Sequence, residues 1–196
     1  MLRKRTVLMT VLALSLVMAA CGQSYQFKGT PYPEGQVAPD FQLTAEDGST
    51  FRLSDERGKV VLMFFGYTSC PDICPTTLAE AKQVLEGLGQ DVDQVDFLFI
   101  TVDPERDTPE KLASYTDIFH PAILGLTGDP DTLATVRDGY GVTAIREETP
   151  DSALGYIVNH TARIFLVDPQ GDLRLSYGFG TPPADIVADV EHLVES

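Results

Sequence analysis

Two apolar runs of strand length dominate the hydrophobic pattern of the chain. Residues 59–65 and 95–102 are almost free of polar interruptions, which is typical of parallel strands buried on both faces. After the first run, apolar residues recur at helical spacing and predict a helix from about Pro75 to Leu88. After the second run, a polar loop leads into another helix that begins near Thr108. The pattern therefore predicts two consecutive strand–loop–helix units.

Shorter elements are predicted on either side of these units. They are a hairpin over 37–53, a strand at 123–126, a helix over 129–140, a hairpin over 163–177 and an amphipathic helix from Pro183. Residues 146–151 are predicted as a polar loop, and His160 is placed on an irregular segment just before strand 163–167. Alternating strands and helices predict an α/β fold with helices on both faces of a mixed sheet. This order is that of a thioredoxin-like (peroxiredoxin-like) fold with an N-terminal β-hairpin extension.

Composition limits the classes of protein that fit this pattern. The chain has 196 residues, 43% of them hydrophobic, which is enough for one globular domain with a full core. The formal net charge is −15, and the only basic cluster lies at residues 3–5. Because nucleic-acid binding depends on clustered Lys and Arg, a nucleic-acid partner is not expected.

The N-terminus is typical of an exported protein. Residues 1–20 combine a basic start, an apolar run and small residues, which predicts a lipoprotein-type signal peptide. The following Cys21 stands where a lipobox cysteine would be lipidated, and an uncleaved transmembrane anchor is the alternative. Residues 21–36 are predicted as a tether and residues 37–196 as the domain. We therefore expect a membrane-tethered lipoprotein on the outer face of the cytoplasmic membrane or in the periplasm.

Cys70 and Cys74 are the candidate chemistry of the chain. They lie four residues apart where the first buried strand gives way to a helix, and a helix N-terminus favours thiolate over thiol. If Cys21 is lipidated, these two thiols can pair only with each other or share a metal. A structural disulfide, a redox-active dithiol and a soft-metal site are the three alternatives. The structural disulfide is the weakest of them, because a loop of about five residues restrains the unfolded chain little.

Copper is the metal that best suits this pair. Two thiolates favour Cu(I), and an added imidazole also suits Cu(II), whereas structural zinc normally takes four protein ligands. Of the three histidines, His120 is in a helix-end context and His192 is expected to face solvent on the last helix. His160 lies where it could fold over the thiol loop, but spacing alone does not distinguish it from an ordinary surface histidine.

Three separated motifs resemble those of the Sco/SenC family, copper-binding, membrane-tethered, thioredoxin-like proteins of cytochrome oxidase assembly. They are Cys70-Pro71-Asp72-Ile73-Cys74-Pro75, Val102-Asp103-Pro104-Glu105-Arg106-Asp107-Thr108-Pro109, and Asn159-His160-Thr161 with Phe165-Leu166-Val167-Asp168-Pro169-Gln170-Gly171. The resemblance implies that Cys70 and Cys74 bind copper, that His160 is the third ligand and that Asp103 is a nearby supporting acid. The family usually has Asp where this chain has Asn159, so any charge support from that position is lost here.

The resemblance also implies a function. We expect a copper metallochaperone, rather than an enzyme, that delivers Cu(I) or Cu(II) to the binuclear copper site of cytochrome c oxidase subunit II. Another periplasmic copper chaperone or a thioredoxin-like reductant is the expected further partner. The alternative is a thiol–disulfide reductase acting on the cysteines of that site, with Cys70 attacking and Cys74 resolving.

A thiol peroxidase and a binding module are two further alternatives. A thiol peroxidase fits poorly, because its usual Thr or Ser and Pro positions hold Tyr67 and Met63 here. A binding module that senses copper or redox state without delivering metal stays open.

Overall fold

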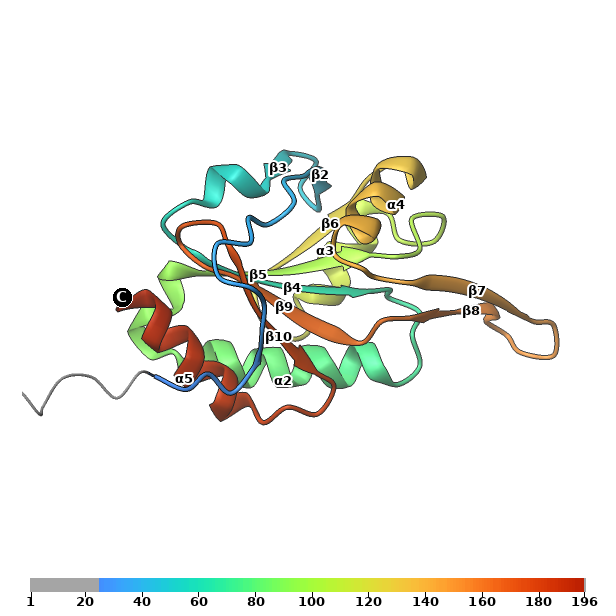
Figure 1. Ribbon diagram of the computed structural model, residues 1–196. Coiled ribbons are helices and arrows are strands. Elements are labelled where there is room, and N and C mark those ends of the chain that lie inside the picture. Colours follow the sequence, from blue (N-terminus) through green and yellow to red (C-terminus); the bar gives the residue numbers. More distant parts are fainter. Residues whose placement is uncertain (1–24, 196) are drawn as a thin grey trace, which may run out of the picture.

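The computed structural model describes residues 25–195, which form a large mixed β-sheet with helices on both faces (Figure 1). The predicted signal peptide over 1–20 and the predicted lipidation site Cys21 lie outside the described residues. The eight strands of the sheet run in the order β1-β10-β9-β4-β5-β6-β2-β3. Their bounds are β1 Thr30–Pro31, β2 Gln42–Ala45, β3 Thr50–Arg52, β4 Val60–Gly66, β5 Val95–Thr101, β6 Ile123–Thr127, β9 Arg163–Val167 and β10 Leu173–Gly178.

Strand β4 lies at the centre of the sheet, and every one of its residues is buried. It pairs in parallel with β5, which in turn pairs in parallel with β6, while β9 runs antiparallel along the other edge of β4. Polar side chains are excluded from β4 because helices cover both of its faces. The predicted buried strands, the mixed sheet and the N-terminal hairpin, formed by β2 and β3, are confirmed.

The helices form two layers around the sheet. Helices α2 (Ile73–Gly87) and α5 (Pro183–Val194) pack against each other on one face, and α3 (Pro109–Thr116) lies against β6 (Figure 1). Helix α4 (Pro130–Gly139) ends at Tyr140, whose ring packs on Phe65 and Phe165 of the opposite face. Two 3-10 helices, η2 (Leu53–Glu56) and η3 (Gly89–Gln94), precede β4 and β5.

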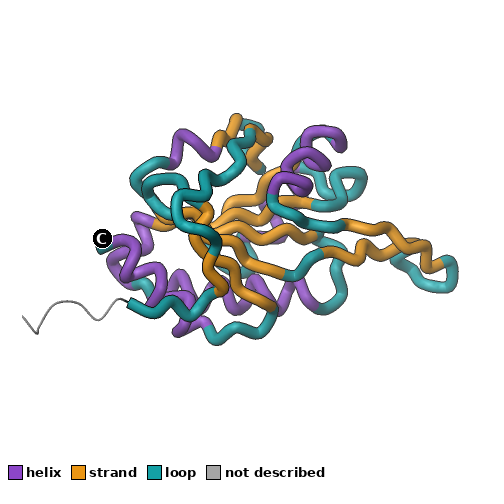
Figure 2. Tube along the Cα trace, in the orientation of Figure 1, coloured by secondary structure: helices purple, strands orange, loops and turns teal. Residues whose placement is uncertain are grey.

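A second, two-stranded sheet projects from the body of the domain (Figure 2). It is a hairpin of β7 (Ala144–Thr149) and β8 (Gly155–His160), paired in antiparallel register from Ala144↔His160 to Thr149↔Gly155. The prediction of a polar loop at 146–151 and of an irregular segment before β9 was therefore wrong. Most of the hairpin is exposed, so its strands lack the apolar alternation that marks a half-buried strand.

The segment expected as a tether is packed onto the domain from Tyr25 onward. Asp189 of α5 is fully buried, and its carboxylate accepts hydrogen bonds from the backbone N–H groups of Lys28 and Gly29 and from the hydroxyls of Tyr25 and Tyr177. These four donors satisfy a buried charge that would otherwise be costly. The carboxylate thereby joins the start of the described chain to β10 and α5.

Candidate metal centre

Cys70 and Cys74 lie in the loop and first helical turn that follow β4. Helix α2 begins at Ile73, two residues earlier than predicted, so Cys74 is already inside the helix while Cys70 precedes it. The backbone N–H of Cys74 donates to the Cys70 Sγ at 3.5 Å, and the Cys70 N–H donates to the Tyr67 carbonyl at 3.2 Å. Both cysteines are free thiols. The end of β4 and the start of α2 therefore bring the two sulfurs close together.

Gly66 allows the second thiol to approach the strand. A Cβ at this position would lie 2.9 Å from the Cys74 Sγ and 2.7 Å from the Phe99 ring. Cys74 is thereby buried with no exposed surface, whereas Cys70 is half-buried. Any larger residue at 66 would push the sulfur out of position.

His160, the last residue of β8, completes the group from the opposite side. Its Nε2 lies 3.4 Å from the Cys74 Sγ, and its Nδ1 lies 3.3 Å from the Thr161 carbonyl oxygen. Because a carbonyl only accepts, this contact places the proton of a neutral imidazole on Nδ1 and leaves the Nε2 lone pair facing the thiols. The rings of Phe64 and Tyr67 stand edge to face with the imidazole, each with its centroid 5.9 Å away.

The two thiols have opposite electrostatic environments. A hydrogen bond from the Cys74 thiol lowers the pKa of Cys70 to about 3, and hydrogen bonds from backbone N–H groups add to this effect. The same hydrogen bond to Cys70, together with burial, raises the pKa of Cys74 above its ordinary value. The pair therefore shares one proton, which stays on Cys74, and presents Cys70 as the thiolate.

Asp107 fixes the thiol loop, a role that sequence reasoning missed. Its carboxylate is almost fully buried and accepts from the Thr68 N–H (3.1 Å), the Thr68 hydroxyl (2.6 Å) and the Thr101 hydroxyl (2.7 Å). Thr68 precedes Cys70 by two residues, so this carboxylate ties the loop to the end of β5. The sequence did contain a signal for this role. The loops that follow neighbouring parallel strands lie at the same edge of the sheet, so an acid in the loop after β5 can reach the thiol loop after β4.

Asp103 does not belong to this group of ligand atoms. The atoms that lie within 4.8 Å of one another belong to Cys70, Cys74 and His160, and among the described residues no acid completes this set. The Asp103 carboxylate instead accepts from the Tyr156 hydroxyl at 2.7 Å and from the Arg106 Nε. It therefore contacts the hairpin that carries His160 rather than the thiols.

The Asn159 side chain contacts the neighbouring strand of the hairpin. Its amide donates to the Glu147 carboxylate on β7 at 2.8 Å. An aspartate at this position would face that carboxylate and be repelled. Glu147 thus gives a local reason for the amide in this chain.

The other two histidines lie away from the group. The Nδ1 of His120 accepts from the Ala122 N–H beyond α3, so its ring does not cap the helix. His192 stacks on Tyr25 with ring centroids 3.9 Å apart and is half-buried, so the expectation that it faces solvent was wrong.

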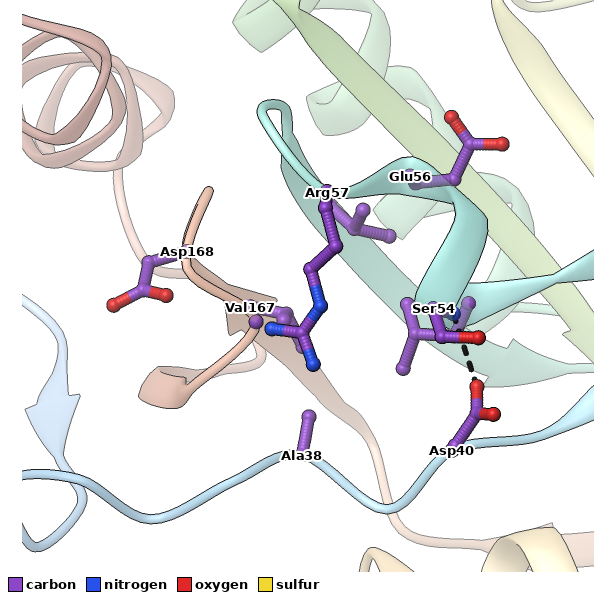
Figure 3. A pocket seen from close by; sticks show the side chains of 10 residues that line it. Ala38, Asp40, Ser54, Glu56, Arg57, Val167 and Asp168 are labelled. Carbon is purple, nitrogen blue, oxygen red and sulfur yellow. Dashed lines mark hydrogen bonds between the residues drawn. The ribbon is translucent and has the colours of Figure 1, made fainter.

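Two hollows differ in what they offer a ligand. A cavity of about 240 Å³ opens beside Cys70 and His160 and is lined by Tyr67, Pro71, Asp72, Ile73, Ile157, Val158 and Asn159. At the other end of β4, Arg57 reaches over Gly171 into a hollow of about 20 Å³ between Asp40 and Asp168 (Figure 3). The second hollow has room for a single water molecule. Only the first adjoins reactive side chains.

The three ligand atoms suit copper. Two sulfurs and one imidazole nitrogen lie within 4.8 Å of one another, so side-chain shifts of about half an ångström would let a single ion contact all three at the usual metal–ligand distances of about 2.0–2.3 Å. Soft thiolates favour Cu(I) and the imidazole suits Cu(II), whereas a closed zinc site would want a fourth protein ligand. A thioredoxin-like domain with this donor set defines a class of soft-metal or dithiol protein.

Comparison with known proteins narrows that class. Residues 29–195 match the SCO1/SenC family model, and the chain belongs to this family. It is 34% identical over 152 residues to an SCO2-like protein of Rickettsia felis, covering 78% of this chain and 74% of that protein.

Solved structures agree with the fold and the metal. The copper-bound structure of ScoI from Bradyrhizobium japonicum has a TM-score of 0.74 at 40% identity and covers 80% of this chain and 99% of that one. BsSco, in which a disulfide switch was identified and which is described as a member of the Sco family of cytochrome c oxidase assembly proteins, has a TM-score of 0.66 at 25% identity. That match covers 85% of this chain and 98% of BsSco. The thioredoxin-like fold and copper as the metal are thereby confirmed.

Proposed function

We propose that this protein is a copper metallochaperone that delivers copper to the binuclear site of cytochrome c oxidase subunit II. The observation that carries the proposal is that the fold brings Cys70 and Cys74 together with His160. His160 lies 86 residues after Cys74 and on a different element. Membership of a family whose proteins bind copper and assist cytochrome oxidase assembly supports it.

The group has the properties that a delivery site needs. Two sulfurs hold Cu(I), and the imidazole allows Cu(II) to be held as well. Cys70 and His160 are half-exposed beside the 240 Å³ cavity, while Cys74 is buried. An acceptor's ligands can therefore reach the metal from the cavity side and displace Cys70 and His160 first, while Cys74 is the last to be displaced.

The test is a titration of the reduced domain with Cu(I) and with Cu(II). We expect Cys70→Ala and Cys74→Ala to lose both ions, and His160→Ala to lose Cu(II) more than Cu(I). His120→Ala, a histidine outside the group, is the matched control. If all three site variants bind copper like the parent, the assignment fails. Copper transfer from the loaded parent to purified oxidase subunit II then tests delivery, and retention of copper would favour a sensing module instead.

A thiol–disulfide reductase is the second candidate, favoured by the half-exposed Cys70 with its pKa lowered to about 3. In that reaction the Cys70 thiolate attacks a partner disulfide, a mixed disulfide forms and one partner thiolate leaves. Cys74 then gives up its proton and attacks the Cys70 sulfur, which releases the second partner thiolate and leaves a Cys70–Cys74 disulfide. A thioredoxin-like reductant would restore the pair.

The imidazole separates the two candidates, because disulfide exchange does not require it. Copper delivery predicts that His160→Ala fails to restore oxidase activity in a strain that lacks this protein. Full restoration by His160→Ala would favour the reductase.

Tethering at the membrane is part of the proposal. None of the helices within residues 25–195 combines the length and hydropathy of a membrane span. We propose that a lipid on Cys21 holds the domain at the outer face of the cytoplasmic membrane. Cys21→Ser should release the protein from the membrane fraction, and continued membrane association of that variant would contradict the lipid anchor.

A further inference from the structure

The hairpin that carries His160 is not part of the main sheet. Within residues 25–195, strands β7 and β8 pair only with each other, whereas the thiols follow β4 at the centre of the eight-stranded sheet. No backbone ladder between the two sheets therefore fixes the imidazole over the thiols. Its position depends on what holds β8 against the body of the domain.

Three side chains join β8 to the loop after β5, and we call them the latch: Asp103, Arg106 and Tyr156. The Tyr156 hydroxyl donates to one Asp103 oxygen at 2.7 Å, and the Arg106 Nε donates to the other. The Arg106 Nη1 also donates to the carbonyl oxygens of Leu154 and Tyr156, each at 3.1 Å. One buried carboxylate and one guanidinium thus hold both the side chain and the backbone of β8.

The Tyr156 ring is also held on both faces. The guanidinium carbon of Arg106 lies 3.6 Å from the ring centroid and that of Arg146 lies 3.7 Å from it. Two guanidinium groups so close to one ring lie on opposite faces of it, and each contributes a cation–π contact. Arg146 also forms an ion pair with Glu105 at 3.0 Å, and Glu105 lies in the same loop as Asp103.

The attachment at Tyr156 affects the position of the His160 imidazole, because both residues lie on the same strand. Alternate residues of a strand point to the same side, so Tyr156, Val158 and His160 face the body of the domain together. Val158 is buried, and its N–H donates to the Tyr67 hydroxyl at 3.2 Å. From Tyr156 to His160 the strand spans about 13 Å. A shift of the latch therefore moves the ring nitrogen relative to the sulfurs.

We propose that Asp103, Arg106 and Tyr156 are positioning residues that set how well the site holds Cu(II) relative to Cu(I). The proposal rests on copper binding by Cys70, Cys74 and His160. Cu(I) is satisfied by two thiolates, while Cu(II) gains from the imidazole. A loosened latch withdraws the imidazole and leaves both sulfurs in place. It therefore weakens Cu(II) binding and spares Cu(I).

Tyr156→Phe tests the proposal, because it removes one hydroxyl and keeps the ring between its two guanidinium groups. Cu(II) and Cu(I) affinities are measured on the reduced protein, together with the Cu(II) electron paramagnetic resonance and thiolate charge-transfer spectra. We expect Cu(II) affinity to fall roughly tenfold, as for the loss of a hydrogen bond to a charged group, with an altered Cu(II) spectrum. Cu(I) affinity should stay within about twofold. Tyr25→Phe is the matched control, because it also removes a hydroxyl that donates to a carboxylate, that of Asp189, at the end of the domain opposite the hairpin (Figure 1).

Arg106→Lys is the second variant, since it keeps the charge but loses the fork that binds Asp103 and two carbonyls. Arg106→Lys should alter the same two Cu(II) spectra in the same way as Tyr156→Phe does. In both metal-free variants, amide hydrogen exchange over residues 155–160 should be faster than in the parent, while exchange in β4 is unchanged.

The outcomes separate this proposal from the proposed function. If the parent does not bind copper through Cys70, Cys74 and His160, the proposed function fails. If the parent does bind it, and Tyr156→Phe either matches the parent in both affinities or loses Cu(I) and Cu(II) equally, the latch is overturned. A change in the ratio of the two affinities, with faster hairpin exchange, supports it.

Discussion

Cys70 and Cys74 show how far two residues of one type can differ over a single helical turn. Cys74 lies under Gly66 and Phe99 with no exposed surface, whereas Cys70 borders the cavity and receives hydrogen bonds. The buried thiol keeps the shared proton because burial disfavours its thiolate. Only Cys70 is therefore prepared to react or to bind metal before a proton is released.

Alkylation of the metal-free, reduced protein tests this difference. With its pKa lowered to about 3, Cys70 is a thiolate at every pH above about 4, so its labelling by iodoacetamide should be nearly constant between about pH 5 and 8. Cys74 should stay unlabelled, as mass spectrometry of the digested protein would show.

Cys74→Ala is the informative control for this measurement. It removes the largest cause of the lowered pKa, so Cys70 labelling should regain a dependence on pH. Labelling of parent Cys70 that rises toward pH 8–9, as for an ordinary thiol with a pKa of about 8.5, would contradict the assignment.

The sequence could identify some site residues and not others. The thiol pair followed from the apolar strand and helical spacing around it. His160 was selected only through the family resemblance, because nothing local marks a histidine that is 86 residues from its partner. Tyr156 could not be found at all, since its role depends on two arginines and an acid brought together by the fold.

At the scale of elements, the buried strands could be predicted from the hydrophobic pattern and the exposed ones could not. Strands β4 and β5 are covered on both faces and gave clear apolar runs. Strand β7 is charged and exposed over most of its length, and only part of β8 is covered, so neither gave a clear strand signal. The element that carries the third ligand was therefore the one that the hydrophobic pattern could not predict.

Asp189 joins three elements, and its removal should affect all of them. Asp189→Ala leaves two backbone N–H groups and two tyrosine hydroxyls without their buried acceptor, so we expect a loss of about 3 kcal/mol or more in the free energy of unfolding. Urea denaturation measures it, and limited proteolysis should cut faster near residues 25–29. The exposed Asp138 on α4 provides a matched control in Asp138→Ala. Equal stability of the two variants would contradict the role of Asp189.

At the scale of the whole molecule, the described chain begins beside α5, and the hairpin projects from the opposite end of the sheet (Figure 1). The metal group lies at the base of that hairpin and draws on both sheets. A bound ion therefore links two sheets that share no strand pairing within the described residues. Copper should stabilise the entire fold rather than one loop.

This stabilisation can be measured as the change in unfolding on adding and removing the metal. At a free Cu(I) concentration of 100 times Kd, the folded protein should gain about 2.7 kcal/mol, less any contribution from copper held by the unfolded chain. Thermal unfolding under anaerobic conditions should show a higher Tm, and a Cu(I) chelator should reverse it. Cys70→Ala should show no gain. An unchanged Tm for the loaded parent would show that the ion does not bind the folded domain preferentially.

The antiparallel pairing of β9 with β4 also has a consequence for the order of folding. The thiols follow the end of β4 and His160 comes just before β9, so the imidazole reaches the sulfurs only after the 86 residues between them have closed into a loop. A chain in which only β4, α2 and β5 have formed offers copper two sulfurs and no nitrogen. The complete donor set exists only in the finished domain, so full loading with copper reports that folding is over.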